Sequence, residues 1–178
     1  MPDTPTNILM AEHRIIEKVI AAMRRFADAL SSGQDVDRQP LSGLVPFMRQ
    51  FADAHHHGKE EHRLFPVLVA CGLPAQNGPV QIMCSEHETG RQMVARLAAA
   101  IDAYGNGAAE TRENLADALR AIAEFYSQHI WKEDNVLFPM AERVLDADST
   151  ANVLVAFREV TMPEDQRQGF IAYAESLG

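Results

Sequence analysis

Residues 55–66 read HHHGKEEHRLFP, and residues 129–139 read HIWKEDNVLFP. Aligned on their shared Leu-Phe-Pro, the two stretches are offset by 73 residues, and each contains a histidine followed four positions later by a glutamate. The pairs are His56 with Glu60 and His129 with Glu133. Four residues correspond to about 400° of rotation on an α-helix, so both side chains of a pair lie on one face. The pattern predicts two helices that each offer an imidazole nitrogen and a carboxylate oxygen to one metal centre.

Hydrophobic residues recur at intervals of three and four in long segments around this pattern, which is typical of amphipathic helices. Turns rich in glycine and proline separate these segments. Two of these turns lie at Gly72–Pro79 and Gly105–Gly107. No pattern of a β-hairpin is found in the sequence. The sequence therefore predicts an all-α, up-down-up-down four-helix bundle. Its four helices are expected at residues 8–30, 40–70 (bent at Pro66), 80–104 and 108–144.

The C-terminal part of the chain is expected to be separate from the bundle helices. A break is predicted at Asp146–Thr150, so that residues 1–150 form the bundle. Residues 151–178 are predicted to form one or two short helices, divided near Met162–Pro163, that pack on the bundle or against a partner. A chain of 178 residues with 47% hydrophobic residues is expected to form one domain with a sizeable core.

The overall charge and hydrophobicity exclude two classes of partner. The net charge is -9, so the electrostatic field of the protein repels phosphate backbones, and we expect no nucleic-acid partner. No stretch reaches the roughly 18 to 20 uninterrupted apolar residues of a membrane-spanning helix, and we expect no membrane partner. The opening residues, MPDTPTN, do not resemble a targeting signal. We therefore expect a soluble, cytoplasmic protein.

The duplication extends to the helices that precede the two quoted stretches. Glu12-His13 in the first predicted helix corresponds to Glu86-His87 in the third. In an antiparallel hairpin the histidines of neighbouring helices come to comparable depth, so His13 is expected opposite His56 and His87 opposite His129. Four imidazoles and two carboxylates are therefore expected to meet in the bundle core.

Such a polar core is unfavourable unless its groups have partners. An unpaired polar side chain in an apolar interior costs about 1 to 3 kcal/mol, and an isolated charge costs more. Bound metal supplies the partners, and imidazole and carboxylate without thiolate favour iron, manganese or zinc. Two ions explain the number of ligands best, with at least one open position on each. In this assignment His13 and His56 bind one ion, His87 and His129 bind the other, and Glu60 and Glu133 bridge the two.

The neighbouring residues leave several roles open. A register that uses His57 and Glu61 also points inward, or His57 is an additional metal ligand. His55 and His62 are expected to be solvent exposed. Tyr126, one turn before His129, is interpreted as a core residue, a hydrogen-bond partner near the metal or an access gate. Three charged residues, Glu12, Glu86 and Arg91, have similar alternatives: the glutamates orient an imidazole or are exposed, and the arginine pairs with a glutamate or guides an anion.

The order of these motifs resembles the hemerythrin-like HHE cation-binding domain family over about Met10–Met140. The resemblance implies a four-helix bundle with a non-haem di-iron centre, in a family whose members bind oxygen, sense oxygen or iron, or respond to nitric oxide and peroxide. One position departs from the oxygen-carrying members, which have His-x-x-x-His on the third helix, because Arg91 follows His87 by four residues here. This departure argues against reversible oxygen carriage. The site that the resemblance implies comprises His13, His56, Glu60, His87, His129 and Glu133.

Two functions follow as hypotheses. The first is a di-iron protein, with an oxo or hydroxo bridge between two iron ions, that binds or reacts with oxygen, nitric oxide or hydrogen peroxide in sensing, stress response or detoxification. Whether the protein turns over such a molecule as an enzyme is left open. The second is a non-catalytic metal-binding, signalling or iron-handling module. In that case the tail is expected to bind a protein partner or a second copy of the chain.

Overall fold

The computed structural model describes residues 4–105, 109–160 and 162–178, and these residues form helices and connecting turns with no strand among them. The predicted all-α class is therefore confirmed. Residues 106–108, where a stop and the start of the fourth helix were predicted, lie outside the described ranges. The elements are α1 (Pro5–Ser31), α2 (Arg38–Pro46), η1 (Phe47–His57), η2 (Glu60–Leu64), α3 (Phe65–Ala70), α4 (Pro79–Tyr104), α5 (Ala109–Lys132), η3 (Glu133–Leu137), α6 (Phe138–Val144), α7 (Ala147–Phe157) and α8 (Glu164–Ser176).

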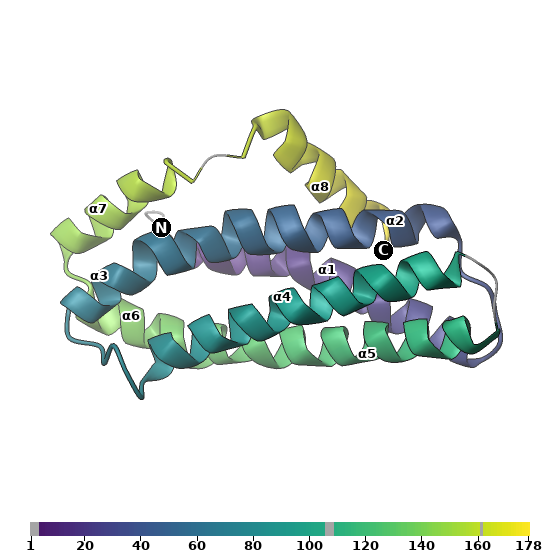
Figure 1. The fold of residues 1–178 in the computed structure, drawn as a ribbon. Helices are drawn as coiled ribbons and strands as arrows, with labels where there is room; N and C mark the ends of the chain where they lie inside the picture. Colours follow the sequence, from purple (N-terminus) through teal and green to yellow (C-terminus); the bar gives the residue numbers. More distant parts are fainter. Residues whose placement is uncertain (1–3, 106–108, 161) are drawn as a thin grey trace.

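Long helical segments lie side by side along one axis (Figure 1). The segment from α2 to α3 is helical throughout, and so is the segment from α5 to α6. Helix α1 packs along α5, and α4 packs along α5 and η1. These segments cover the four predicted helices closely, because each start and stop signal acts locally. For example, the Thr4 hydroxyl accepts a hydrogen bond from the Asn7 amide and caps α1 (3.2 Å).

The two Leu-Phe-Pro sequences coincide with short π-helical segments that the sequence analysis did not predict. Proline has no amide hydrogen and its ring crowds the carbonyl one turn earlier, so Pro66 and Pro139 disfavour the regular α-helical pattern before them. The helix widens there: the Phe65 amide bonds to the Glu60 carbonyl, five residues back, and the Phe138 amide bonds to that of Glu133. Both wider turns begin at the glutamate of the His-x-x-x-Glu motif, so the duplication includes this backbone feature.

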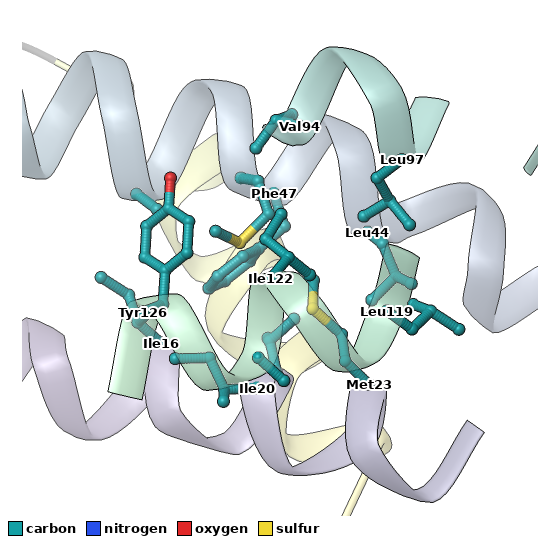
Figure 2. Close-up of a cluster of buried hydrophobic side chains, with 14 of the residues drawn as sticks. Ile16, Ile20, Met23, Leu44, Phe47, Val94, Leu97, Leu119, Ile122 and Tyr126 are labelled. Atoms are coloured by element: carbon teal, nitrogen blue, oxygen red, sulfur yellow. The ribbon is translucent and has the colours of Figure 1, made fainter. Parts of the chain in front are cut away.

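Two hydrophobic clusters form the core. The larger one joins α1, α2, η1, α4 and α5, and Figure 2 shows some of its side chains, including Ile16, Phe47 and Tyr126. The smaller one contains Leu9 of α1, Phe65 of α3 and residues of α4, α6 and α7. Along each long segment, the histidines and glutamates of the two motifs lie between the residues of the two clusters. The polar centre is therefore enclosed in the middle of the molecule.

The C-terminal helices pack on the rest of the chain (Figure 1). The Tyr173 hydroxyl of α8 donates to the Pro40 carbonyl (2.6 Å), and its ring lies so close to Gly43 that a Cβ there would clash. Helix α7 contacts α1 and η2. The predicted break at Asp146–Thr150 was wrong in extent, because the Asp146 carboxylate caps α7 through the Ser149 amide and the helix begins at Ala147.

Within the described ranges, none of the helices combines the length and hydrophobicity that a membrane-spanning segment needs.

Candidate metal centre

Seven predicted ligand side chains meet in the interior, and all are buried. Their donor atoms form two groups, within each of which the atoms lie no more than 4.8 Å apart. The Nε2 atoms of His13 and His56, one from each helix of the first hairpin, are 2.9 Å apart. The first group contains His13, His56, Glu60 and Glu133, and the second contains His57, His87 and His129.

The two glutamates lie between the histidines of both groups. Glu133 Oε2 is 3.2 Å from His13 Nε2 and 3.4 Å from His129 Nε2, and Glu133 Oε1 is 3.6 Å from His87 Nε2. Glu60 has one oxygen 3.7 Å from His56 Nε2 and the other 3.4 Å from His87 Nε2. Each carboxylate therefore faces imidazoles of both groups, which is the arrangement that two bridging carboxylates require.

Several buried polar atoms in this centre have no hydrogen-bond partner among the described residues. They include both carboxylate oxygens of Glu60 and of Glu133, and the Nε2 atoms of His87 and His129. Unpartnered buried polar atoms are rare in folded proteins, because each one loses its hydration without compensation. Here they converge on one place, and all are atoms that coordinate metal ions. The residues present therefore fit a metal centre.

Each of the four histidines predicted as the primary ligands contacts a carboxylate through its other ring nitrogen. His56 Nδ1 donates to Glu12 (3.0 Å), and His129 Nδ1 donates to Glu86 (3.0 Å). This result selects the orienting role among the alternatives for these two glutamates. The other two contacts are His13 Nδ1 with Asp134 and His87 Nδ1 with Glu61, both at 2.7 Å. Such contacts fix the ring orientation and leave Nε2 as the metal-binding atom.

Each orienting carboxylate is itself held by a cationic side chain. Lys59 donates to Glu12, and Lys132 donates to Glu86. Likewise, Arg14 donates to Asp134 and Arg91 donates to Glu61 (2.7 Å for the latter pair). We call His56, Glu12 and Lys59 the first-half triad, and His129, Glu86 and Lys132 the second-half triad. The sequence contains a signal for these cations, because the 73-residue offset places Lys59 over Lys132.

Burial and the neighbouring charges shift the pKa values of the donors. Burial lowers the pKa of His56 to about 4, which outweighs its hydrogen bond to Glu12, so its imidazole is neutral. Burial also lowers the pKa of His13, but its contacts with Asp134 and Glu133 outweigh burial and raise the pKa to about 9. Metal binding at His13 therefore has to displace a proton at neutral pH.

The pKa values of Glu60 and Glu133 shift in opposite directions. Burial and the charge of Glu133 raise the pKa of Glu60 well above its ordinary value. Burial also raises the pKa of Glu133, but the nearby imidazoles of His129, His13 and His87 outweigh burial, and this pKa is lowered. Two buried carboxylates at this separation do not both ionise readily without cations between them. Bound metal cations would supply that charge.

His57 lies in the second group, so the structure resolves part of the register alternatives. Its ring stacks on that of His87, with centroids 3.8 Å apart and 7° between the planes. His57 Nδ1 contacts Asp53 (3.2 Å), whose two carboxylate oxygens share the hydrogen bond that Arg91 Nε donates. Glu61 lies outside both groups, where it holds His87. The two groups thus contain His56, Glu60 and His57 and leave out Glu61.

The expected exposure of His55 was wrong, whereas that of His62 is confirmed. His55 is 8% exposed, and its Nε2 lies 2.8 Å from Lys59 Nζ and 3.1 Å from Glu12 Oε1. The expectation failed because residues of α7 and α8, which lie far away in sequence, line this side of η1 together with His55. Asp134 was missed because its contact with His13 joins two helices, whereas Asp53 was missed although it lies four residues before His57 in the same helical segment.

A small cavity lies beside His57. It has a volume of about 260 Å³, and Asp53, Arg91 and Tyr126 are among its lining residues. The Tyr126 ring lies parallel to that of His57, with centroids 6.2 Å apart. At Gly90 a Cβ would lie 2.6 Å from the Tyr126 hydroxyl oxygen, so glycine allows this close approach. Tyr126 is both a core residue and a wall of the cavity.

The geometry defines a helical protein with a buried histidine and carboxylate metal centre. Residues 4–141 match the hemerythrin HHE cation binding domain, and the chain belongs to this family. An uncharacterized protein of Mycobacterium tuberculosis H37Rv is 24% identical over 159 residues, which cover 89% of this chain and 62% of the relative. Uncharacterized proteins of Mycobacterium tuberculosis CDC 1551 and Mycobacterium bovis show the same identity and coverage. The chain thus spans about three fifths of the length of these relatives.

Proposed function

We propose that this protein is a non-haem di-iron protein that binds or reacts with a small diatomic molecule or a peroxide, in sensing, stress response or detoxification. The observation that carries the proposal is the convergence of unpartnered glutamate oxygens and histidine nitrogens in the interior. In this proposal His13 and His56 hold one iron ion. His57, His87 and His129 hold the other.

Membership of the cation-binding family and the types of donor support iron. Imidazole and carboxylate ligands suit iron, with manganese or zinc as alternatives, and thiolate is missing from both donor groups. Glu60 and Glu133 would bridge the ions, since each faces imidazoles of both groups. Bound iron would supply redox chemistry and coordination positions for a small ligand. We also infer that the four long helical segments run up-down-up-down around this centre.

The cavity beside His57 supports a small ligand. Its volume of about 260 Å³ is below the roughly 300 to 1,000 Å³ of pockets for drug-sized molecules. Tyr126 and the ion pair between Arg91 and Asp53 form part of its wall. We propose that a small molecule reaches the centre from this side, with Tyr126 as the aromatic wall next to His57.

The decisive experiment is metal analysis of the full chain, expressed with iron and purified without oxygen. We expect about two iron ions per chain, and near-ultraviolet absorption of a bridged iron pair after exposure to oxygen. The variant His56→Ala should lose iron. His62→Ala is the matched control, because His62 lies in the same segment but is exposed, and it should retain the full iron content. A wild-type chain that retains neither iron nor manganese would refute the proposal.

Turnover measurements distinguish the reactive protein from a non-catalytic metal-binding module. The iron-loaded protein should consume hydrogen peroxide or nitric oxide faster than the same concentration of free iron. Stoichiometric binding without consumption would instead favour the module. Arg91→Gln should alter the rate with peroxide while two ions remain bound, because Arg91 lines the cavity and reaches the centre only through carboxylates.

A further inference from the structure

A second cavity, of about 570 Å³, lies between the bundle and the C-terminal tail. Its lining residues from the bundle include His55 and Lys59, and those from the tail include Phe157, Arg158 and Arg167. The tail residues lie beyond residues 4–141, which match the family, so this cavity is not part of the matched domain. Its volume falls in the range that binds small organic molecules.

Two polar side chains that line the cavity, His55 and Arg158, have atoms without partners. His55 Nε2 lies 2.8 Å from Lys59 Nζ and 3.1 Å from Glu12 Oε1, so this ring nitrogen has partners. The other ring nitrogen of His55, Nδ1, is a buried atom with no partner among the described residues. Arg158, at the rim, likewise has no ion pair within the described ranges. A buried ring nitrogen without a partner indicates room for a ligand, and the unpaired guanidinium of Arg158 favours a ligand with an oxyanion group.

The acidic residues of the cavity already have partners. Glu12 accepts hydrogen bonds from Lys59 and His56. Glu164 Oε2 lies 3.6 Å from Arg167 Nε. The cavity therefore offers more unengaged positive than negative charge, although the chain as a whole carries a net charge of -9. Anion binding to such an acidic protein has to come from a local site, because the overall field repels anions.

The remaining walls are hydrophobic. Leu154, Phe157 and Met162 of the tail face Ile8 of α1 across the cavity. Phe157 is 5% exposed, and its ring centroid is 6.0 Å from Lys59 Nζ. An inorganic anion would leave most of these apolar walls without contact. A ligand with an acidic head and a short hydrocarbon body would use both parts of the cavity.

We propose that this cavity binds a small organic anion, a molecule with a carboxylate or phosphate head and an apolar body. The head contacts Lys59, His55 and Arg158, and the body packs on Phe157 and its neighbours. Because Lys59 holds Glu12, which holds His56, the ligand lies at the outer end of the first-half triad. The proposal does not depend on the identity of the metal.

Calorimetric titration of the full chain, as purified and at low ionic strength, tests the proposal with matched probes. Hexanoate should bind at one site per chain. Hexanamide has the same shape without the charge, and acetate has the charge without the hydrocarbon, so each should bind at least about tenfold more weakly. Hexyl phosphate and inorganic phosphate form the corresponding pair for a phosphate head. A preference for hexanoate or for hexyl phosphate identifies the source of the oxyanion.

Variants test the location. Arg158→Gln should weaken hexanoate binding by about tenfold, the effect of one charge-assisted hydrogen bond. Arg120→Gln is the matched control, because Arg120 is an exposed arginine paired with Asp117 on α5, outside the cavity, and it should bind as the wild type does. The proposal is overturned if the amide binds as tightly as the acid, if acetate equals hexanoate, if both variants weaken binding equally, or if no probe binds.

Discussion

The first-half and second-half triads have the same chemistry but different surroundings. The Lys59 side chain is 6% exposed, whereas the Lys132 side chain is 40% exposed. Residues of α7 and α8 cover the first triad, and the second lies at the surface beside Trp131, which is 60% exposed. The duplicated motif therefore determines which groups meet the metal, and the sequence outside the duplication determines how far each half is shielded from water.

A second difference lies closer to the centre. The 73-residue offset places His57 over Ile130 and Asp53 over Tyr126, so only the first half supplies an additional imidazole. His57 joins His87 and His129, both from the second half. The two proposed ion positions are consequently not equivalent, although the sequence motifs that form them are nearly the same.

The largest effect is expected from the carboxylates that face both groups. Glu133→Gln replaces a group that contacts three histidines, and Glu60→Gln replaces one that contacts two. We expect Glu133→Gln to lose both iron ions and Glu60→Gln to retain more metal, measured as iron per chain. Circular dichroism controls for loss of the fold. Equal iron content in the two variants would show that the halves contribute equally.

The next effect concerns the stability of the metal-free protein. Glu12→Gln leaves the buried Lys59 without its carboxylate, which should lower the free energy of unfolding by roughly 3 to 5 kcal/mol. Glu86→Gln affects the half-exposed Lys132 and should cost less than about 1 kcal/mol. Urea unfolding measures both.

A double variant tests the reason for this difference. Adding Lys59→Met to Glu12→Gln removes the unpaired charge, so it should recover much of the lost stability. If Glu12→Gln and Glu86→Gln cost the same, the shielding of the first triad by the tail would have no energetic consequence.

The sequence predicted the all-α class and the extent of the long helices because start signals, stop signals and periodicity are local. It also identified the seven candidate donor residues, because a repeated His-x-x-x-Glu is visible without a structure. Exposure was harder to predict. His55 was expected to be exposed, although it follows the core residue Phe51 by four positions, and it is buried beside residues from position 154 onward.

The charged partners of the histidines also show that contacts between distant segments are hard to predict from the sequence. Asp134 and Glu61 follow the motif glutamates directly and occupy corresponding positions, so the alignment contained a signal for them. Their partners, His13 and His87, lie on other helices, and the pairing follows only from how the helices pack. Neither Asp53 nor Arg91 has an equivalent in the other half, and no repeat could identify them.

A smaller effect is expected when His57 is replaced by the residue of the other half. His57→Ile should weaken metal binding at one of the two ion positions by about 10- to 100-fold, because one donor is lost while the bridging carboxylates remain. Burial lowers the pKa of His57 well below its ordinary value, so the imidazole is neutral and an apolar substitute is tolerated. Metal titration should therefore show one weakened and one unchanged step. Two unchanged steps would exclude His57 as a ligand.

The smallest effect is the pH dependence of metal binding at His13, which contacts Asp134. Because the pKa of His13 is raised to about 9, zinc binding should release a proton at neutral pH, and the apparent affinity should increase by up to about tenfold per pH unit until about pH 9. In the metal-free protein the same shift stabilises the fold fully below pH 6.5, and this stabilisation is lost as the pH rises through 9.

Asp134→Asn removes the main hydrogen bond that raises this pKa, so proton release should shift to lower pH. Calorimetry in two buffers with different ionisation enthalpies measures the release, and Asp117→Asn, an exposed aspartate paired with Arg120, is the control. If Asp134→Asn leaves the profile unchanged, the proton does not come from His13.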